Sequence, residues 1–476
     1  MSGRGVAGLF LFFACLYALS LGRGFYSSDG EVMFQTTAAL VERGTFALPP
    51  DPNLPQIVPG RGGRWYGKYG AGFPVLLVPF YMAGNALAAV NAAHRTHTAA
   101  LSVLVASALL AAGAAAGVGA LSGSRWAAIA AGLATPLWWY GRVLFAEAAL
   151  ACALSWALWA LRRRHAWLAG ALIGMGVAAR GGFAVYGLAA WGLAWGAHAE
   201  VRERPPAGAR RPPRKRGAKR QSRFGCAVRR TAARPLRALR ARARPAGGHP
   251  ARAFLTGLLP FLALALAFNA YRFGAPWRTG YAGEGFTTPL WRGVGGLLLS
   301  PQRSVFLFAP PLALSVALWP RYLRRDPLMA RFLALAWTLA LPFYGAWWAW
   351  GGGWCWGPRF LVPLLPLSML PLSTLPPHRA WRTLAAALIA LGALVNMAGV
   401  LVDVTPYFTR GGLSPVLYAA ERLWWGQTEP LAFFHLRTLG LPPTWDVGLP
   451  ALLLLGLATG TWLLAYNAVE HIRKGE

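Results

Sequence analysis

Apolar stretches recur along the whole of this 476-residue chain, and they limit its fold more than any other feature. A helix needs about 20 apolar residues to cross a bilayer, and 56% of this chain is hydrophobic. In lipid, every backbone polar group must be satisfied within the protein. The stretches are rich in Ala, Leu and Gly and do not alternate, which favours helices over barrel strands. We therefore expect an all-α polytopic membrane protein, with a single membrane domain over residues 1–476.

About 12 transmembrane helices, within a range of 11–13, account for these stretches. A signal peptide is the alternative for the first, because Ala18-Leu19-Ser20 follows its apolar run. We expect an uncleaved helix, because the residues after it look functional. The expected spans cover residues 6–23, 97–121, 125–145, 147–162, 166–180, 183–198, 253–272, 304–319, 330–349, 360–376, 383–402 and 448–468.

Basic residues orient the chain, because cytoplasmic loops of membrane proteins carry an excess of Lys and Arg. The chain holds 47 Lys+Arg against 15 Asp+Glu, and the largest basic block is residues 199–252. We expect this block to be a disordered cytoplasmic loop that can contact anionic lipid headgroups. Because the charge is clustered beside spans, nucleic acid is not an expected partner. Other basic residues fall on the same side: Arg162, Arg163, Arg164, Arg321, Arg324, Arg325, Arg379, Arg382, Arg473 and Lys474.

One apolar segment, residues 71–93, conflicts with this orientation if it crosses the membrane. A crossing there would place Asp29 on the face opposite Glu147. We therefore expect a re-entrant or interfacial segment, and Pro74 and Pro79 fit an interrupted helix. One further span is the alternative. Without it, the N- and C-termini are both cytoplasmic.

The long outer loops are then residues 24–96, 273–303 and 403–447. Short juxtamembrane helices are expected in them, such as the run EVMFQTTAALVERG that Gly44 ends. The outer face is also rich in acids. An acidic outer face fits an active or binding surface, although basic inner loops alone would also leave acids outside. Ten of the 15 acids fall on this face: Asp29, Glu31, Glu42, Asp51, Glu147, Glu284, Asp403, Glu421, Glu429 and Asp446.

The first outer loop opens with the acids Asp29 and Glu31 and closes with Tyr66, Lys68 and Tyr69. Acids at one end and cations at the other suit a substrate with a hydroxyl to activate and a phosphate to neutralise. Helix capping by Asp29 and the serine before it is the alternative, because capping uses the same residue types.

Two charged residues interrupt apolar sequence farther on. Glu147 opens an expected span, where a carboxylate is costly unless it faces protein or water; it could instead be a favourable acid at a helix N-terminus. Arg180 lies between two apolar halves and is well placed for a lipid phosphate. Ordinary snorkelling of Arg180 to the interface is the alternative.

Two glycine- and aromatic-rich segments complete the candidate surface. Residues 269–311 include Arg272, Glu284 and Arg303, and residues 347–360 hold five tryptophans and Arg359. Aromatic faces can stack on sugar rings or form an interfacial belt. Five tryptophans within a stretch of 14 residues exceed what anchoring requires, which favours a stacking or headgroup site.

Other chemistries lack their motifs. The sequence has no GxGxxG after a strand, P-loop, HExxH or GxSxG. ATP hydrolysis and zinc proteolysis are therefore disfavoured. The four cysteines lie far apart, without metal-ligand spacing or an expected disulfide: Cys15, Cys152, Cys226 and Cys355.

The order of the motifs resembles the GT-C superfamily of integral membrane glycosyltransferases, and more narrowly the protein mannosyltransferase / aminoarabinose transferase group (glycosyltransferase family 39-like). SSDGEV is similar to the acid motif after the family's first helix, and GKYGAGFPVLL to the Lys-containing end of its first loop. FAEAAL and MGVAARGGFA resemble later motifs. The basic block 199–252 is not a family feature. The family's adjacent acids are here separated by Gly30, which leaves the role of Glu31 open.

The resemblance implies an inverting hexosyl or pentosyl transfer from a polyprenyl-phosphate sugar on the outer or periplasmic face of the plasma (inner) membrane. Asp29 would be the general base or would bind a divalent metal, which is the one cofactor that the resemblance brings in. Lys68 and Arg180 would bind the lipid phosphate. The acceptor would be a glycan, lipid or protein. A polyprenyl-lipid transporter or flippase is the alternative, but the inverted repeats typical of carriers are not evident. A second alternative is that the chain is a non-catalytic assembly partner.

The candidate site residues fall into three sets. The catalytic set is Asp29, Glu147 and Glu31, and the lipid-phosphate set is Lys68, Arg180, Arg272, Arg303 and Arg359. The substrate-binding set is Tyr69, Tyr66, Glu284, Trp354 and Trp356.

Overall fold

A computed structural model describes residues 1–22, 24–88, 95–203, 249–410, 414–424, 454–463 and 465. Most of the basic block, Cys226, the later part of the loop 403–447 and the ends of the last expected span lie outside these residues. The described part is mainly helical, with one small sheet. The all-α expectation is thus confirmed.

The α-helices are α1 (Gly3–Leu19), α2 (Ser28–Arg43), α3 (Gly72–Ala88), α4 (Arg95–Ser122), α5 (Arg125–Leu133), α6 (Leu137–Arg142), α7 (Glu147–Arg162), α8 (Ala166–Ala179), α9 (Ala184–Glu203), α11 (Pro250–Phe273), α12 (Leu290–Leu299), α13 (Val305–Phe308), α14 (Pro311–Ala317), α15 (Trp319–Arg325), α16 (Pro327–Ala346), α17 (Arg379–Leu401), α18 (Thr405–Arg410) and α19 (Pro415–Trp424). The 3₁₀ helices are η1 (Arg61–Gly63), η3 (Gly181–Phe183), η4 (Arg359–Leu361) and η5 (Leu367–Thr374). The strands are β1 (Ala47–Leu48), β2 (Ile57–Pro59) and β3 (Trp65–Gly67).

Four of the described helices are long and apolar enough to cross a membrane, namely α4, α11, α16 and α17. Five shorter apolar helices accompany them, so the expected count of about 12 spans is not established. Large apolar side chains point outward from α11 and α17, where Leu264 and Leu394 are 64% and 58% exposed. Apolar surfaces of this kind are stable in contact with lipid rather than with water. The chain is therefore an integral membrane protein.

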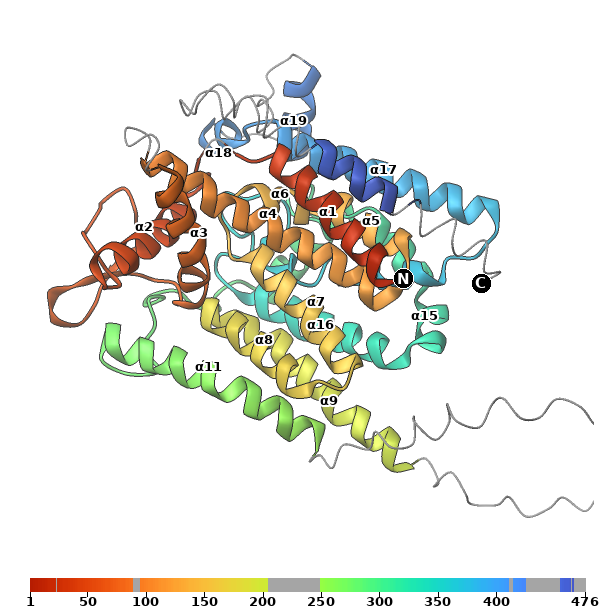
Figure 1. Ribbon diagram of the computed structural model, residues 1–476, viewed down its shortest axis with the longest axis horizontal. Helices are drawn as coiled ribbons and strands as arrows, with labels where there is room; N and C mark the ends of the chain where they lie inside the picture. The colour runs from red at the N-terminus through yellow and green to blue at the C-terminus, as the bar shows by residue number, and fades with distance from the viewer. Residues whose placement is uncertain are drawn as a thin grey trace, which may run out of the picture.

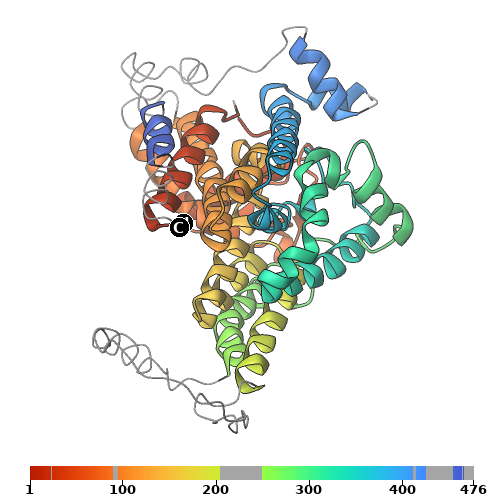
Figure 2. The same ribbon diagram turned by 90° about the vertical axis from the view of Figure 1, so that its right-hand side faces the viewer.

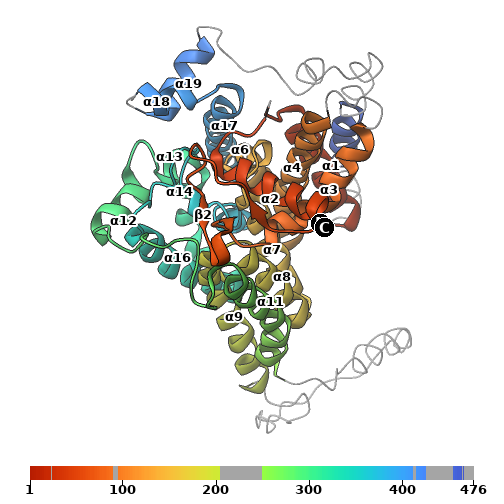
Figure 3. The same cartoon turned by 90° about the vertical axis from the view of Figure 1, so that its left-hand side faces the viewer.

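The long helices lie side by side (Figure 1). The start of α1, the end of α9 and the start of α11 lie toward one end of the bundle, and α2 lies toward the other (Figure 1). Seen along the bundle, the red α1 and the orange α4 lie on one side and the teal α14–α16 on the other (Figure 2). The view from the opposite end shows α2 and β2 in front of α7 and α8 (Figure 3).

Two expected spans are interrupted where proline falls. The span 125–145 is two helices, α5 and α6, separated by the turn before Leu137. The span 304–319 is likewise divided between α13 and α14, because proline cannot donate a backbone hydrogen bond and clashes with the preceding turn. By contrast α7 and α8 begin at the expected residues.

The expected span 360–376 is not an α-helix. The chain there forms turns and the 3₁₀ helices η4 and η5, because prolines recur at positions 358, 363, 366 and 371. All residues from 355 to 372 are buried. Non-helical backbone at membrane depth is tolerated where protein surrounds it, so this segment is part of the core.

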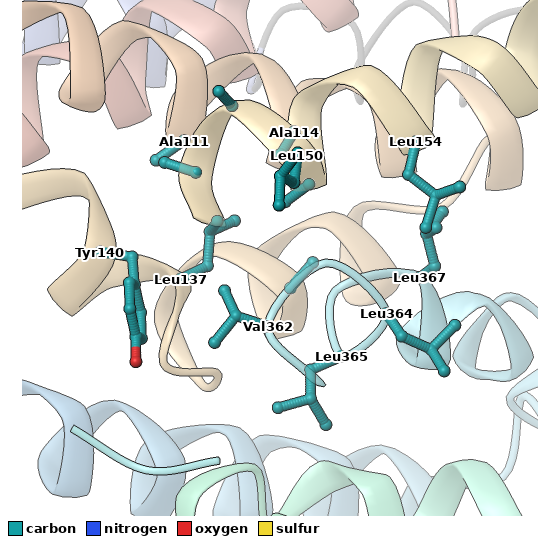
Figure 4. Close-up of a cluster of buried hydrophobic side chains, with 14 of the residues drawn as sticks. Ala111, Ala114, Leu137, Tyr140, Leu150, Leu154, Val362, Leu364, Leu365 and Leu367 are labelled. Atoms are coloured by element: carbon teal, nitrogen blue, oxygen red, sulfur yellow. The ribbon is translucent and has the colours of Figure 1, made fainter. Parts of the chain in front are cut away.

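The core holds this segment against α4, α6 and α7. Small residues line α4, which packs against α1, α3 and α7. Figure 4 shows apolar side chains from three helices meeting those of the proline-rich segment: Ala111, Ala114, Leu137, Tyr140, Leu150, Leu154, Val362, Leu364, Leu365 and Leu367. The packing brings the start of the segment, at Arg359, beside the start of α7.

The first loop builds α2 and a three-stranded antiparallel sheet of order β1-β3-β2. Ser27 is the N-cap of α2, with its hydroxyl accepting a hydrogen bond from the Gly30 amide, and Gly44 ends the helix at φ 62°. The cap is therefore not Asp29 or the serine directly before it, which contradicts the capping alternative. The segment after the sheet forms α3, whose interfacial placement stays a prediction.

Cysteine labelling from the two sides of the membrane tests the predicted orientation. In a cysteine-free background, we expect single cysteines at Lys68, Glu284 and Trp354 to react with an impermeant thiol reagent from outside. Cysteines at Arg214 and Lys215, in the basic block, should react only after the membrane is opened, because positive loops stay cytoplasmic. Labelling of both sets from the same side would contradict the orientation.

Candidate functional site

Four charged side chains from distant segments meet inside the protein and form what we term the buried cluster: Asp29, Glu147, Arg180 and Arg359. They come from the first turns of α2 and α7, the C-cap of α8 and η4. Glu147 is 1% exposed, Arg359 6% and Asp29 8%. Buried charges are costly unless they are paired, and here each acid has a guanidinium partner.

Arg359 joins the two acids of the buried cluster. Its Nη2 donates to Asp29 Oδ2 at 2.5 Å and its Nε to Glu147 Oε1 at 2.7 Å. Its guanidinium also lies 4.2 Å from the centroid of the Phe145 ring. One planar group thereby fixes two carboxylates, which a lysine could not do in the same geometry.

Arg180 pairs with the same oxygen of Glu147 that Arg359 contacts. The other oxygen, Oε2, is buried without a hydrogen-bond partner. A buried carboxylate oxygen in this state is ready to accept a hydrogen bond from a ligand. Arg180 is 15% exposed at its side chain, so it lies toward the edge of the buried cluster.

The ionisation of Asp29 is set by its neighbours. Burial raises the pKa of Asp29, but the charges of Arg359 and Arg180 and hydrogen bonds from Tyr69 and Arg359 outweigh it, and the pKa is lowered below its ordinary value. Burial, together with the Asp29 charge, raises the pKa of Tyr69, so its hydroxyl keeps its proton and donates it. Asp29 is therefore a carboxylate at neutral pH.

Lys68 lies in a second, less buried group, which we term the rim pair. Its Nζ is 2.8 Å from Glu284 Oε1, and the two side chains are 17% and 20% exposed. Trp348 Nε1 donates to Glu284 Oε2 at 2.9 Å. The ammonium also lies near the Tyr69 and Tyr281 rings, 5.8 and 5.2 Å from their centroids.

Tyr281 and Tyr69 lie between the rim pair and the buried cluster. Burial raises the pKa of the Tyr281 hydroxyl; the Arg180 charge opposes this rise, and the Asp29 and Glu284 charges add to it. Tyr69 contacts Asp29 on one side and the Lys68 ammonium on the other. A molecule that contacts both groups would thus meet a cation and an acid in the same place.

The remaining predicted residues have other partners. Arg272 and Arg303 donate to main-chain carbonyls, the first to Gly67 and Tyr69 and the second to Gly353, Cys355 and Gly357. Their phosphate-binding role stays a prediction. Glu31 accepts a hydrogen bond from Gln35 within α2.

The predicted aromatic residues also differ in their burial and in their partners. Tyr66 is buried in the sheet and Trp356 is fully buried, with its indole N–H donating to Asn396. Trp354 is 52% exposed and stacks on Phe408. Of the substrate-binding set, Tyr69 and Glu284 therefore lie at the two charged groups, and the other three lie elsewhere.

Sequence reasoning missed Tyr281 and Trp348. Tyr281 stands three residues before Glu284, and Trp348 belongs to the tryptophan run. Both were visible as members of aromatic segments. The signal that singles them out is spatial, because their partners lie more than 60 residues away in the chain.

The residues present do not fit a divalent metal at Asp29. Within the described ranges, no group of three or more His, Cys, Asp or Glu could hold a metal ion. Both carboxylates already contact Arg359, and Arg180 adds a second positive charge. A cation there would face two guanidinium groups with too few oxygen ligands.

No family model and no curated protein matches this sequence. Two solved structures do, both of ArnT from Cupriavidus metallidurans. The apo structure has a TM-score of 0.48 at 15% identity, covering 96% of this chain and 74% of that one. The structure bound to undecaprenyl phosphate has 0.46 at 15%, covering 94% and 79%. At this level the likenesses carry no argument about function.

Proposed function

We propose that this chain is a GT-C-type glycosyltransferase that moves a sugar from a polyprenyl-phosphate donor to an acceptor at the outer face of the membrane. The observation that carries the proposal is the meeting of Asp29, Glu147, Arg180 and Arg359 beside the Lys68 rim pair. The order of the sequence motifs supports it independently. No nucleotide site is needed, because such a donor is already activated and membrane-bound.

The chemistry requires a cation at the departing phosphate. When the bond between the sugar carbon and the phosphate oxygen breaks, the phosphate carries away the electron pair and gains negative charge. Lys68 and Arg180 supply positive charge on the exposed side of the cluster. Preorganised charge of this kind stabilises a transition state more than a ground state.

The acceptor requires an acid nearby. Its hydroxyl oxygen forms the new bond to the sugar carbon, from the face opposite the phosphate, and its proton passes to a carboxylate. Asp29 is ionised and can take that proton or orient the hydroxyl. Its lowered pKa makes it a weak base in the ligand-free state, so orientation is the larger part of its assigned role.

Replacing Lys68 with glutamine is expected to weaken binding of undecaprenyl phosphate by about ten- to a hundredfold, as for loss of a charge-assisted hydrogen bond. The measurement is tryptophan fluorescence of the protein in nanodiscs titrated with the lipid, since Trp348 contacts the partner of Lys68. Arg292→Gln, at an exposed arginine of α12, is the matched control and should bind like wild type.

Equal affinities of wild type and Lys68→Gln would contradict the assignment of Lys68. Binding without sugar transfer from any polyprenyl-phosphate donor would instead favour a carrier that uses the same cations without chemistry.

A further inference from the structure

Arg272 is a buried arginine whose contacts all lie within the protein. It stands in the last turn of α11 and is 2% exposed. Its Nη1 donates to the carbonyls of Gly67 at 2.5 Å and Tyr69 at 2.8 Å, and its Nη2 donates to Asn269 Oδ1 at 3.0 Å. The two carbonyls flank Lys68, so a single guanidinium nitrogen holds the backbone on both sides of that residue.

The surroundings of Arg272 fit a structural contact better than a ligand site. The guanidinium lies 4.0 Å from the Phe268 ring centroid and 4.6 Å from that of Phe273. The cavity that it lines has room for no more than about one water molecule. A phosphate could reach it only if the segment around Lys68 moved away.

Gly280 constrains the same segment from the other side. A Cβ atom added there would lie 2.4 Å from the Lys68 Cα, closer than such contacts allow. The Lys68 amide also donates to the Gln56 carbonyl at 2.8 Å. The backbone at Lys68 is therefore held between α11, the sheet and the loop that carries Glu284.

This segment links the two charged groups. Lys68 belongs to the rim pair, and the next residue, Tyr69, lies beside Asp29 of the buried cluster, where its hydroxyl helps to lower the pKa of that carboxyl. A shift of its backbone would thus move a cation and a hydroxyl together. Displacements of about 1 Å can cost a catalytic site two orders of magnitude.

We propose that Arg272 is a positioning residue, which sets the Gly67–Tyr69 backbone so that Lys68 and Tyr69 meet their partners, and that Gly280 completes this support. The proposal deepens the proposed function and rests on it for its catalytic meaning. It assigns Arg272 no direct contact with phosphate.

A ligand-free measurement tests the placement of Lys68. The protein in detergent is treated with an impermeant amine-acylating ester, and the rate at Lys68 is followed by peptide mass spectrometry. We expect Arg272→Gln, Arg272→Lys and Gly280→Ala to raise this rate severalfold, because the contact with Glu284 loosens. Arg278→Gln, at an exposed arginine of the same loop, should leave it unchanged. An unchanged acylation rate in Arg272→Gln would overturn the proposal. If that variant does not fold, the acylation rate at Lys68 in Gly280→Ala is the deciding measurement, and an unchanged rate there would overturn the proposal.

A double-mutant cycle separates positioning from direct binding. Undecaprenyl phosphate should bind about tenfold more weakly to Arg272→Gln. The double variant with Lys68→Gln should be no weaker than Lys68→Gln alone, because Arg272 acts through Lys68. Additive losses, or full affinity in Arg272→Lys, would make Arg272 a direct charge partner of the phosphate and overturn the proposal. If wild type does not bind this lipid, the proposed function fails, and the acylation rates still decide the role of Arg272.

Discussion

Replacing Asp29 with asparagine is expected to lower sugar transfer by about a hundred- to ten-thousandfold, the usual range for loss of an acid–base group. The fold and the affinity for undecaprenyl phosphate should be retained within a few fold, because asparagine has nearly the same shape and Lys68 and Arg180 remain. The measurement is turnover of a polyprenyl-phosphate sugar, with binding measured in parallel. Retention of binding with loss of transfer would separate the acid's role in chemistry from any role in lipid capture.

The acid Glu31 provides the control. It stands two residues after Asp29 but bonds to Gln35 within its own helix, so Glu31→Gln should keep most of the activity. Full turnover by Asp29→Asn would refute the assignment of Asp29.

Acid stability provides a second readout. The pKa of Asp29 is lowered in the folded protein, because Arg359 and Arg180 outweigh the effect of burial. Its contribution to stability is thus present above its ordinary pKa and is lost as pH falls through the lowered pKa. In Asp29→Asn this contribution is absent, so the unfolding temperature of the variant should fall less than that of wild type as the pH is lowered through this range.

Replacing Arg359 with glutamine is expected to cost about 3–5 kcal/mol of stability and to abolish transfer. Removing one partner of a buried ion pair leaves uncompensated charge, which is more costly than the pair is stabilising. Here Arg359 is the partner of both Asp29 and Glu147. The measurement is thermal unfolding in detergent, together with turnover. Arg359→Lys keeps the charge but cannot contact both carboxylates in the same plane, and it should restore only part of the loss.

Arg180→Gln is the matched comparison, because among the described residues Arg180 forms an ion pair only with Glu147, and its loss leaves Glu147 paired with Arg359. We expect a smaller loss of stability. An Arg359→Gln protein as stable as wild type would show that the two acids do not depend on this guanidinium, and the description of the buried cluster would be wrong.

Periodicity and hydropathy predicted the helical class and the places of α7 and α8, because those helices have no proline inside and begin or end at charged residues. The same reasoning failed over residues 360–376. Hydropathy counts apolar side chains, but here proline decides the backbone, and burial in protein removes the need for a lipid-facing helix.

The site was predictable in part. Asp29, Glu147, Lys68 and Arg180 stood out because each was a charge at the edge of apolar sequence. Three of them lie in the buried cluster, and Lys68 lies beside it. The bridging role of Arg359 was not predictable, because Arg359 lies 330 positions from Asp29 and 212 from Glu147 in the chain. Arg272 and Arg303 carried the same charge signal, yet their partners are main-chain carbonyls, which no residue pattern marks.

The most direct test of the proposed function is a cryo-electron microscopy structure of the protein in nanodiscs with undecaprenyl phosphate. We predict that the lipid phosphate lies within about 3 Å of the Lys68 ammonium, facing Arg180, with Glu284 moved away from its present contact. A phosphate bound on another face of the molecule, with the Lys68–Glu284 contact intact, would contradict the account.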